Sequence, residues 1–384
     1  MKLLIYRLNF IRKFFFQIKK KKINFLPPKK TKIIIYDSNL SNYLISLIKN
    51  TNYQILFTRG ESINIFIFIK TFLKFKLTFL DYCNEYLAYV KPKFVITFTD
   101  NDKRFYLLKI NSGKKIFIQN AWRSFLLTDL GNFKYNSNFK VDFMLVFNDY
   151  IGKLYSSIIS GKSYSIGSFR SNSNLIVNSQ KKYEILYIST FRNISNNTQI
   201  AKNLKFDFFI KKEIKVLKIL KKFCQKHKKK IYIYGKYTQI VDQKIEYNFF
   251  KKIMGNHFQY IKNNKKKTYQ YIDRSKIVLG SDSTLTYESL SRGNKTLFFN
   301  IRFKNKGPSL SKKFGWPKKV NGKIFFLINS LNYNDFEKTF FLIYFMDLKK
   351  WKNKVKKIMN DILKYNLYNK LCIKFLKKIG FYKQ

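Results

Sequence analysis

The stretch Ile277–Asn300, IVLGSDSTLTYESLSRGNKTLFFN, decides the fold. An apolar run comes first, four small polar residues follow, and a second apolar run ends the stretch. Between the two runs, the pattern predicts a helix over roughly Thr284–Ser291, capped by Asp282 or Ser283. Gly293 suits the left-handed residue that commonly follows a helix. We therefore expect a strand, a helix and a second strand here.

The same alternation runs through the chain twice, on either side of a polar linker at residues 170–182. Strands are expected at residues 32–37, 53–58, 93–100, 114–120, 141–148, 183–190, 230–235, 258–262, 276–280 and 295–300. Residues 62–79 are ambiguous, and long helices close the chain. Strands that alternate with helices indicate parallel-sheet α/β domains. We expect a basic amphipathic arm at 1–30, one domain at 31–172, and a second at 181–384 that includes the closing helices.

Composition excludes several classes of protein. The 384 residues are 46% hydrophobic, which is enough for a packed core. Three separated cysteines exclude a disulfide scaffold, and two histidines argue against a histidine metal site. We therefore predict no metal and no cofactor, and we expect a cytoplasmic protein.

The chain is strongly basic, with a net charge of +56 from 77 Lys+Arg against 21 Asp+Glu. Only ten of the basic residues are arginine, and Phe, Ile, Asn and Tyr are also abundant. Because all of these except arginine have AT-rich codons, we attribute about half the excess to codon bias. Lysine also pairs less well than arginine with phosphate. The charge alone does not indicate a nucleic-acid partner.

The first 24 residues combine apolar and basic side chains. Leu4, Leu8, Ile11, Phe15 and Ile18 recur at helical spacing beside several lysines and arginines. The pattern suits a helix that lies on an anionic membrane surface, and equally a helix packed on the protein's own core. The apolar segment at residues 64–80 is interrupted by lysines, so its uninterrupted apolar runs are too short to span a bilayer.

The carboxyl ends of parallel strands are where such sheets bind ligands. In the second half, the hydroxyls of Ser281, Ser283 and Thr284 precede a predicted helix, whose free N–H groups favour phosphate. Glu288 lies one turn inside and could accept both hydroxyls of a ribose. Ordinary capping with a Glu288–Arg292 ion pair is the alternative.

Two further strand ends of the second half carry cations. Arg192 and Lys236 follow the runs at 183–190 and 230–235, where they could face a pyrophosphate.

The first half offers polar strand ends with less specific chemistry. Asp100 and Asp102 could ligate Mg²⁺, although a turn and a helix cap are the preferred interpretation. Glu61, two residues after Arg59, could be a general base or half of an exposed ion pair. Asp37 also ends a strand.

The next strand end carries amides and a guanidinium. Gln119 and Asn120 could orient sugar hydroxyls, and Arg123 could hold a phosphate or carboxylate; the alternative is a turn with Trp122 as core filler.

Taken in order, several segments resemble the bacterial surface carbohydrate biosynthesis proteins, a family of glycosyltransferases of the two-Rossmann (GT-B) type. The resemblance covers roughly residues 31–302, and Ala121 departs from the glycine usual in its QN-x-x-R run. It rests on YDSN, TRGESIN, VITFTDND, IFIQNAWR, VFNDYIGKLY, YSIGSFRSN, ILYISTFR and LGSDSTLTYESLSRGNKTLFFN.

The resemblance implies two Rossmann-like domains that face a cleft, with a nucleotide sugar bound mainly by the C-terminal one. It implies Glu288 as the ribose clamp, Ser281, Ser283 and Thr284 as phosphate contacts, and transfer without a metal. The base would be Asp37, Glu61, Asp100 or Asp102. The acceptor would be a growing surface polysaccharide or lipopolysaccharide. The basic surface and the N-terminal arm would suit a lipid-linked acceptor at the inner face of the cytoplasmic membrane.

Three other functions compete with sugar transfer. Teichoic-acid polymerases share the architecture and transfer a polyol phosphate. A nucleic-acid-binding protein would suit the charge, but no nucleic-acid motif is present and the lysines are spread over the whole chain. A non-catalytic scaffold is the third alternative.

Overall fold

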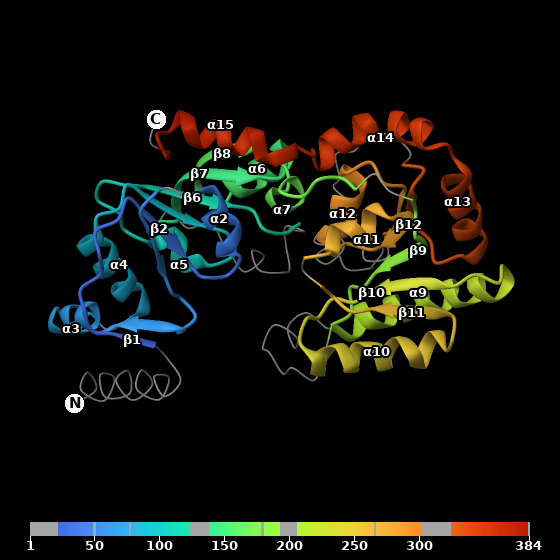
Figure 1. Ribbon diagram of the computed structural model, residues 1–384, viewed down its shortest axis with the longest axis horizontal. Coiled ribbons are helices and arrows are strands. Elements are labelled where there is room, and N and C mark those ends of the chain that lie inside the picture. The colour runs from blue at the N-terminus through green and yellow to red at the C-terminus, as the bar shows by residue number, and fades with distance from the viewer. Residues whose placement is uncertain are drawn as a thin grey trace. The chain divides into compact units, whose positions relative to one another are not determined.

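The computed structural model describes residues 22–48, 51–76, 78–122, 138–177, 180–192, 206–264, 266–300 and 324–382. These residues fall into two compact α/β units, each visible in Figure 1. The first contains residues 22–120, 138–170 and 369–382, and the second contains residues 121–122 and 171–368, with the gaps given above.

The first unit is built on a six-stranded, fully parallel sheet with the strand order β3-β2-β5-β6-β7-β8. Its strands are β2 (Ile33–Tyr36), β3 (Tyr53–Leu56), β5 (Phe94–Thr97), β6 (Lys114–Ile118), β7 (Lys140–Val146) and β8 (Ser160–Ser165). Its helices are α2 (Ser41–Leu47), α3 (Ile65–Leu73), α4 (Phe79–Val90), α5 (Lys103–Leu107), α6 (Asp149–Ser156) and α7 (Phe169–Asn172), whose last two residues lie in the second unit. A small parallel pair, β1 (Lys22–Asn24) and β4 (Ser62–Asn64), lies beside α3. The direction of the strand order reverses between β2 and β5.

The second unit also has a six-stranded parallel sheet, with the order β11-β10-β9-β12-β13-β14. Its strands are β9 (Tyr183–Ile188), β10 (Ile231–Tyr234), β11 (Phe258–Ile261), β12 (Ser275–Gly280), β13 (Thr296–Phe299) and β14 (Leu327–Ile328). Its helices are α9 (Phe206–Lys226), α10 (Ile240–Met254), α11 (Thr268–Asp273), α12 (Thr284–Ser291), α13 (Tyr333–Phe345) and α14 (Leu348–Ile362), followed by a short 3₁₀ turn, η1 (Leu367–Asn369). Counted from β9, this is the 3-2-1-4-5-6 order of the Rossmann fold.

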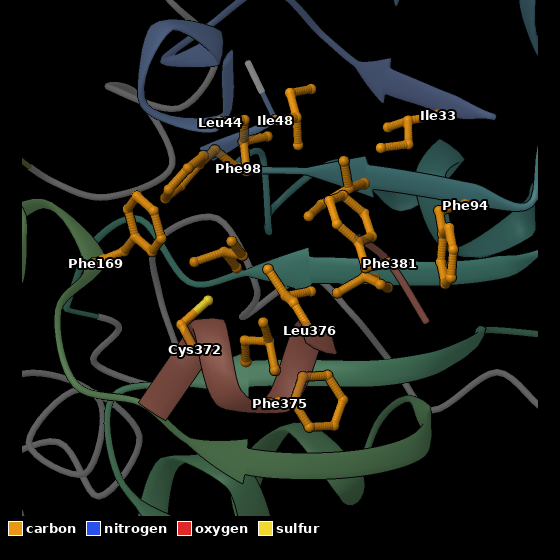
Figure 2. Packing of buried hydrophobic residues seen from close by; sticks show 14 of the residues in the cluster. Ile33, Leu44, Ile48, Phe94, Phe98, Phe169, Cys372, Phe375, Leu376 and Phe381 are labelled. Atoms are coloured by element: carbon orange, nitrogen blue, oxygen red, sulfur yellow. The ribbon is translucent and has the colours of Figure 1, made fainter. Parts of the chain in front are cut away.

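The last helix, α15 (Lys370–Lys378), belongs to the first unit. Cys372 and Leu376 are fully buried and pack, with Phe375 and Phe381, against the core of the first sheet that contains Ile33 (Figure 2). This corrects the prediction that all of 181–384 forms the second domain. An amphipathic pattern shows that a helix has an apolar face, but not which sheet covers it.

The prediction of two parallel-sheet α/β domains is confirmed. Of the ambiguous residues 62–79, residues 62–73 form β4 and α3, and the Asn64 side chain accepts the Ile67 N–H and caps the helix. The predicted arm lies mostly outside the described residues. Within the described part of the chain, no helix is long and apolar enough to cross a membrane.

Candidate functional site

The predicted phosphate site of the second unit lies at the carboxyl ends of β9 and β12. Leu279 of β12 pairs with Tyr187 of β9, so Ser281 and Ser189 leave the sheet at the same edge. The strand order reverses between these two strands. In sheets of this kind, ligands bind outside the carboxyl ends of the strands at such a reversal.

Helix α12 begins directly at this edge. It spans Thr284–Ser291, as predicted, and Gly293 follows it with a φ of 83°. Ser283 occupies the N-cap position, but its side chain makes no capping hydrogen bond. Gly280 allows the helix to lie close to the strand, because a Cβ atom at Gly280 would approach Thr286 Oγ1 to 2.3 Å. The free N–H groups at the start of α12 therefore border the end of β12.

Two buried hydroxyls at this junction have no hydrogen-bond partner among the described residues. They are Ser281 Oγ and Thr286 Oγ1, on residues that are 4% and 0% exposed. A buried polar group without a partner costs free energy, and such groups are rare in folded proteins. The two hydroxyls therefore indicate a binding site. The sequence analysis named Ser281 as a phosphate contact but did not name Thr286.

Thr284 contacts a segment far away in the sequence. Its Oγ1 accepts the backbone N–H of Trp122 at 2.8 Å. The Trp122 indole stacks on Tyr287 with a centroid distance of 4.1 Å and an interplanar angle of 12°. The sequence analysis offered Trp122 only as core filler, whereas the structure places it on α12, the helix of the predicted phosphate site.

Glu288 is buried within α12, at 2% exposure. The alternative of a Glu288–Arg292 ion pair is wrong, because Arg292 pairs with Asp273 at 2.9 Å from Nε to Oδ1. The Arg292 guanidinium also donates to the carbonyls of Ser171 and Asn174, which fixes the linker to the second unit. Burial acts to lower the pKa of Arg292, but the hydrogen bonds that its guanidinium donates to Asp273 outweigh this effect and the pKa is raised.

A buried carboxylate, Glu246 on α10, organises the neighbouring strand ends. It accepts the backbone N–H of Lys236 at 3.0 Å, the Tyr260 hydroxyl at 2.8 Å and the Ser189 hydroxyl. Burial and this carboxylate raise the pKa of Tyr260. The sequence analysis missed Glu246, since a single glutamate in a helical pattern carries no motif.

The two predicted cations of this unit lie near that edge. The Lys236 ammonium donates to the Phe191 carbonyl at 3.2 Å, and Arg192 is exposed at the next residue. Thr190, at the end of β9, is tied by its hydroxyl to Glu213 at 2.9 Å.

The corresponding reversal in the first unit, between β2 and β5, is filled by a hydrogen-bonded network. Asp37 is 2% exposed and has a φ of 77°. Its carboxylate accepts Arg59 Nε at 3.1 and 3.0 Å, the Thr99 hydroxyl at 2.8 Å and the Asn39 N–H at 3.0 Å. The hydrogen bonds to Asp37 raise the pKa of Arg59. This carboxylate is engaged on both oxygens.

Glu61 is the exposed carboxylate of the predicted set. It accepts the Ser38 hydroxyl at 2.6 Å and the Arg59 backbone N–H at 3.1 Å. The first unit thus brings Asp37, Arg59 and Glu61 together at the end of β3.

Asp100 and Asp102 have separate structural contacts. Asp102 is the N-cap of α5, accepts the Arg104 N–H at 3.0 Å and pairs with the Arg104 guanidinium at 2.7 Å. Burial opposes its ionisation, but the Arg104 hydrogen bonds prevail and lower its pKa. Asp100 is fully buried and accepts the Tyr155 hydroxyl. The interpretation of this motif as a turn and a helix cap is confirmed for Asp102.

Two of the three predicted acceptor-binding residues hydrogen-bond to the backbone of the first unit. Gln119 is 1% exposed and its Oε1 accepts the Phe147 N–H at 2.9 Å. The Asn120 amide donates to the Phe98 carbonyl at 2.6 Å. Arg123 lies outside the described residues. Among the residues that the structure describes, no cluster of three or more His, Cys, Asp or Glu could hold a metal ion.

Three solved structures show to which fold class the two units belong. The S. aureus MnaA–UDP co-structure has 12% identity and a TM-score of 0.52, over 95% of this chain and 98% of that one. The H444N variant of the wall teichoic acid polymerase TagF has 11% identity and a TM-score of 0.52, over 98% of this chain and 96% of that one. A UDP-N-acetylglucosamine 2-epimerase has 11% identity and a TM-score of 0.50, over 93% of this chain and 98% of that one. At these identities the likeness establishes the fold: two Rossmann-like units of the GT-B type.

Family membership is more specific than the fold. The model of the family described as "putative O-antigen biosynthesis protein" matches residues 116–380, which is more than half of the chain. The chain belongs to this family, and it is a surface carbohydrate biosynthesis protein of the GT-B fold. No protein of curated function matches the sequence.

Proposed function

We propose that the protein is a glycosyltransferase that moves a sugar from a nucleotide-activated donor to a growing surface polysaccharide or lipid-linked acceptor. The observation that carries the proposal is the pair of unpartnered hydroxyls, Ser281 and Thr286, beside the start of α12 at the β9–β12 reversal. A nucleotide's diphosphate is the kind of ligand that such a helix start attracts. The MnaA neighbour, seen with UDP, and the O-antigen family support a nucleotide sugar.

We assign the donor to the second unit. The α12 N–H groups and the hydroxyls of Ser281, Ser283 and Thr284 would hold the phosphates, and Glu288 would accept the ribose hydroxyls. Lys236 and Arg192 would add positive charge as the diphosphate leaves. The reaction then needs no metal, and we place it at the inner face of the cytoplasmic membrane.

Among the predicted carboxylates, Glu61 suits the general base best. A base must reach the acceptor hydroxyl and accept its proton. Asp100 is buried, and Asp37 and Asp102 each bind a guanidinium, whereas Glu61 is exposed and is oriented by Ser38 and the Arg59 N–H. Glu61→Gln should lower kcat by about 10²–10⁴-fold with the folded state unchanged.

The donor is tested first by a thermal-shift screen of nucleoside diphosphates and sugar nucleotides, then by calorimetry with the best binder. Glu288→Ala should weaken that binding by at least about tenfold, because a charge-assisted pair of hydrogen bonds is lost. Glu288→Gln, which keeps the side-chain volume, guards against a folding defect. Glu337→Ala, on α13 of the same unit, is the control and should bind normally.

Two results would sink this assignment: full nucleotide affinity in both Glu288 variants, or no binding by any compound of the screen. Product analysis with a labelled donor separates the chemistries. A labelled sugar on the acceptor supports sugar transfer, and glycerol phosphate on the acceptor supports the polyol-phosphate alternative.

A further inference from the structure

We propose that the exposed face of α3 docks the first unit on an anionic lipid bilayer. Ile69, Phe72 and Leu73 of this helix are 51%, 37% and 69% exposed, and Phe75, just beyond its end, is 70% exposed. Contiguous exposed apolar side chains on a folded protein mark a surface that binds something. We call these four side chains the α3 face.

The α3 face is held rigidly in place. Residues 69, 72 and 73 recur at i, i+3 and i+4, so they share one side of the helix. Ile67 and Thr71 are the buried residues of the helix, and Thr71 donates to the Ile67 carbonyl at 2.7 Å. Helix α3 packs on α4 and on the β1–β4 pair, at one end of the first unit (Figure 1). The apolar face is therefore a fixed feature of the unit.

Lysines accompany the α3 face. Lys70 is on the helix and Lys74 is its C-cap, and the two reach the buried carboxylate of Glu85 on α4 at 3.7 and 2.8 Å. Lys76 is exposed and makes no ion pair with any described residue.

A fourth lysine, Lys30 in the segment before β2, lies against the adjoining helix α4. The Lys30 ammonium lies 4.1 Å from the centre of the Tyr89 ring on α4. The second nearby carboxylate is Asp81, which is engaged in the capping box of α4 with Thr78. The surface around the α3 face thus has four lysines and two carboxylates, and both carboxylates have partners. Its net charge is positive.

An anionic bilayer matches this combination of side chains. Lipid headgroups offer negative charge above an apolar layer, and nine helical residues, about 14 Å long, can lie in that interface. A second copy of the chain fits less well. A symmetric pair would bring each lysine-flanked face against itself, and like charges would repel.

The experiment is co-sedimentation of the full chain with vesicles of phosphatidylglycerol and phosphatidylcholine, against vesicles of phosphatidylcholine alone. The parent protein should prefer the anionic vesicles, by about fivefold for each lysine near the surface. Phe72→Glu combined with Leu73→Glu should reduce the partition coefficient by about tenfold or more. Leu342→Glu, at a leucine of α13 in the second unit that is 53% exposed, should leave the partition coefficient unchanged.

Deleting residues 1–21 in each background separates the α3 face from the N-terminal arm. If the deletion abolishes binding while the α3 variant binds like the parent, the proposal is overturned. It is also overturned if light scattering shows that the parent is a dimer and the α3 variant a monomer, because the face would then be an interface between copies.

A conservative variant covers the case in which the two charges impair folding. Phe72→Trp keeps the apolar character, and its fluorescence should be quenched by vesicles of brominated anionic lipid. Leu342→Trp is the matched probe. Equal quenching of the two probes would refute docking through α3.

Discussion

The two sheets end in polar edges of opposite character. Where the strand order reverses in the first unit, Asp37 binds Arg59, Thr99 and Asn39, so its hydrogen-bonding capacity is used within the protein. At the reversal in the second unit, the Ser281 hydroxyl has no hydrogen-bond partner among the residues that the structure describes. We call the first edge closed because its carboxylate is satisfied, and the second edge open because its serine hydroxyl is not. Thr58 Oγ1, just after β3, is a buried hydroxyl of the first unit that also lacks a partner among the described residues.

The difference shows that a carboxylate at a strand end is weak evidence for catalysis. Asp37 and Asp102 are charged and lie at predicted ligand-binding edges, yet each is neutralised by an arginine of its own unit. At the second edge, the phosphate contacts that we propose are uncharged hydroxyls and helix N–H groups, which are less conspicuous in a sequence than a carboxylate. Three predictions test this contrast.

The largest effect is expected for the carboxylate that organises the second edge. Glu246→Ala removes the acceptor of the part-buried Lys236 N–H and Tyr260 hydroxyl and of the buried Ser189 hydroxyl. It should lower the free energy of unfolding by about 3–5 kcal/mol. Chemical denaturation measures this loss in the free energy of unfolding. Glu61→Ala, an exposed carboxylate of the first edge, should cost less than about 1 kcal/mol. Equal losses in the two variants would contradict the contrast.

Much of the fold follows from local sequence. The bounds of α12 could be predicted from residue types within a dozen residues, a serine at the N-cap position and a glycine after the last turn, although the Ser283 side chain makes no capping hydrogen bond. The alternation of apolar runs also indicated both parallel sheets. What could not be predicted depends on distant partners. Thr99 meets Asp37 from 62 residues away, and Trp122 meets Thr284 from 162 residues away.

The assignment of α15 has the same explanation. Its apolar face, with Cys372 and Leu376, needs a sheet, and both sheets of the chain offer an apolar surface. Only the packing shows that it covers the first one. Likewise, the role of Glu246 depends on three strand ends that meet in space, and no spacing in the sequence announces it.

A medium effect is expected at the closed edge. Asp37→Asn removes the charge that holds Arg59 and should lower the free energy of unfolding by about 1.5–3 kcal/mol. Arg59→Lys keeps the charge but loses the planar fork, so it should recover only part of the stability. Urea titration measures both. If Asp37→Asn is fully stable but inactive in sugar transfer, then Asp37 is the base, and both the closed edge and the role of Glu61 are wrong.

The smallest effect in stability is expected at the open edge, and its sign is the informative part. Ser281 Oγ has no partner to lose, so Ser281→Ala should leave the free energy of unfolding unchanged or raise it by up to about 1 kcal/mol. Binding of the best nucleotide from the screen should fall about five- to tenfold, because one hydrogen bond to the phosphate is lost.

Ser289→Ala is the matched control on the same helix. The Ser289 hydroxyl is buried too, but it is paired with Thr296 Oγ1 at 3.1 Å. This variant should therefore lose about 0.5–1.5 kcal/mol of stability and keep its nucleotide affinity. If instead Ser281→Ala is the less stable variant and binds as well as the parent, then Ser281 is a structural hydroxyl and the second edge is as closed as the first.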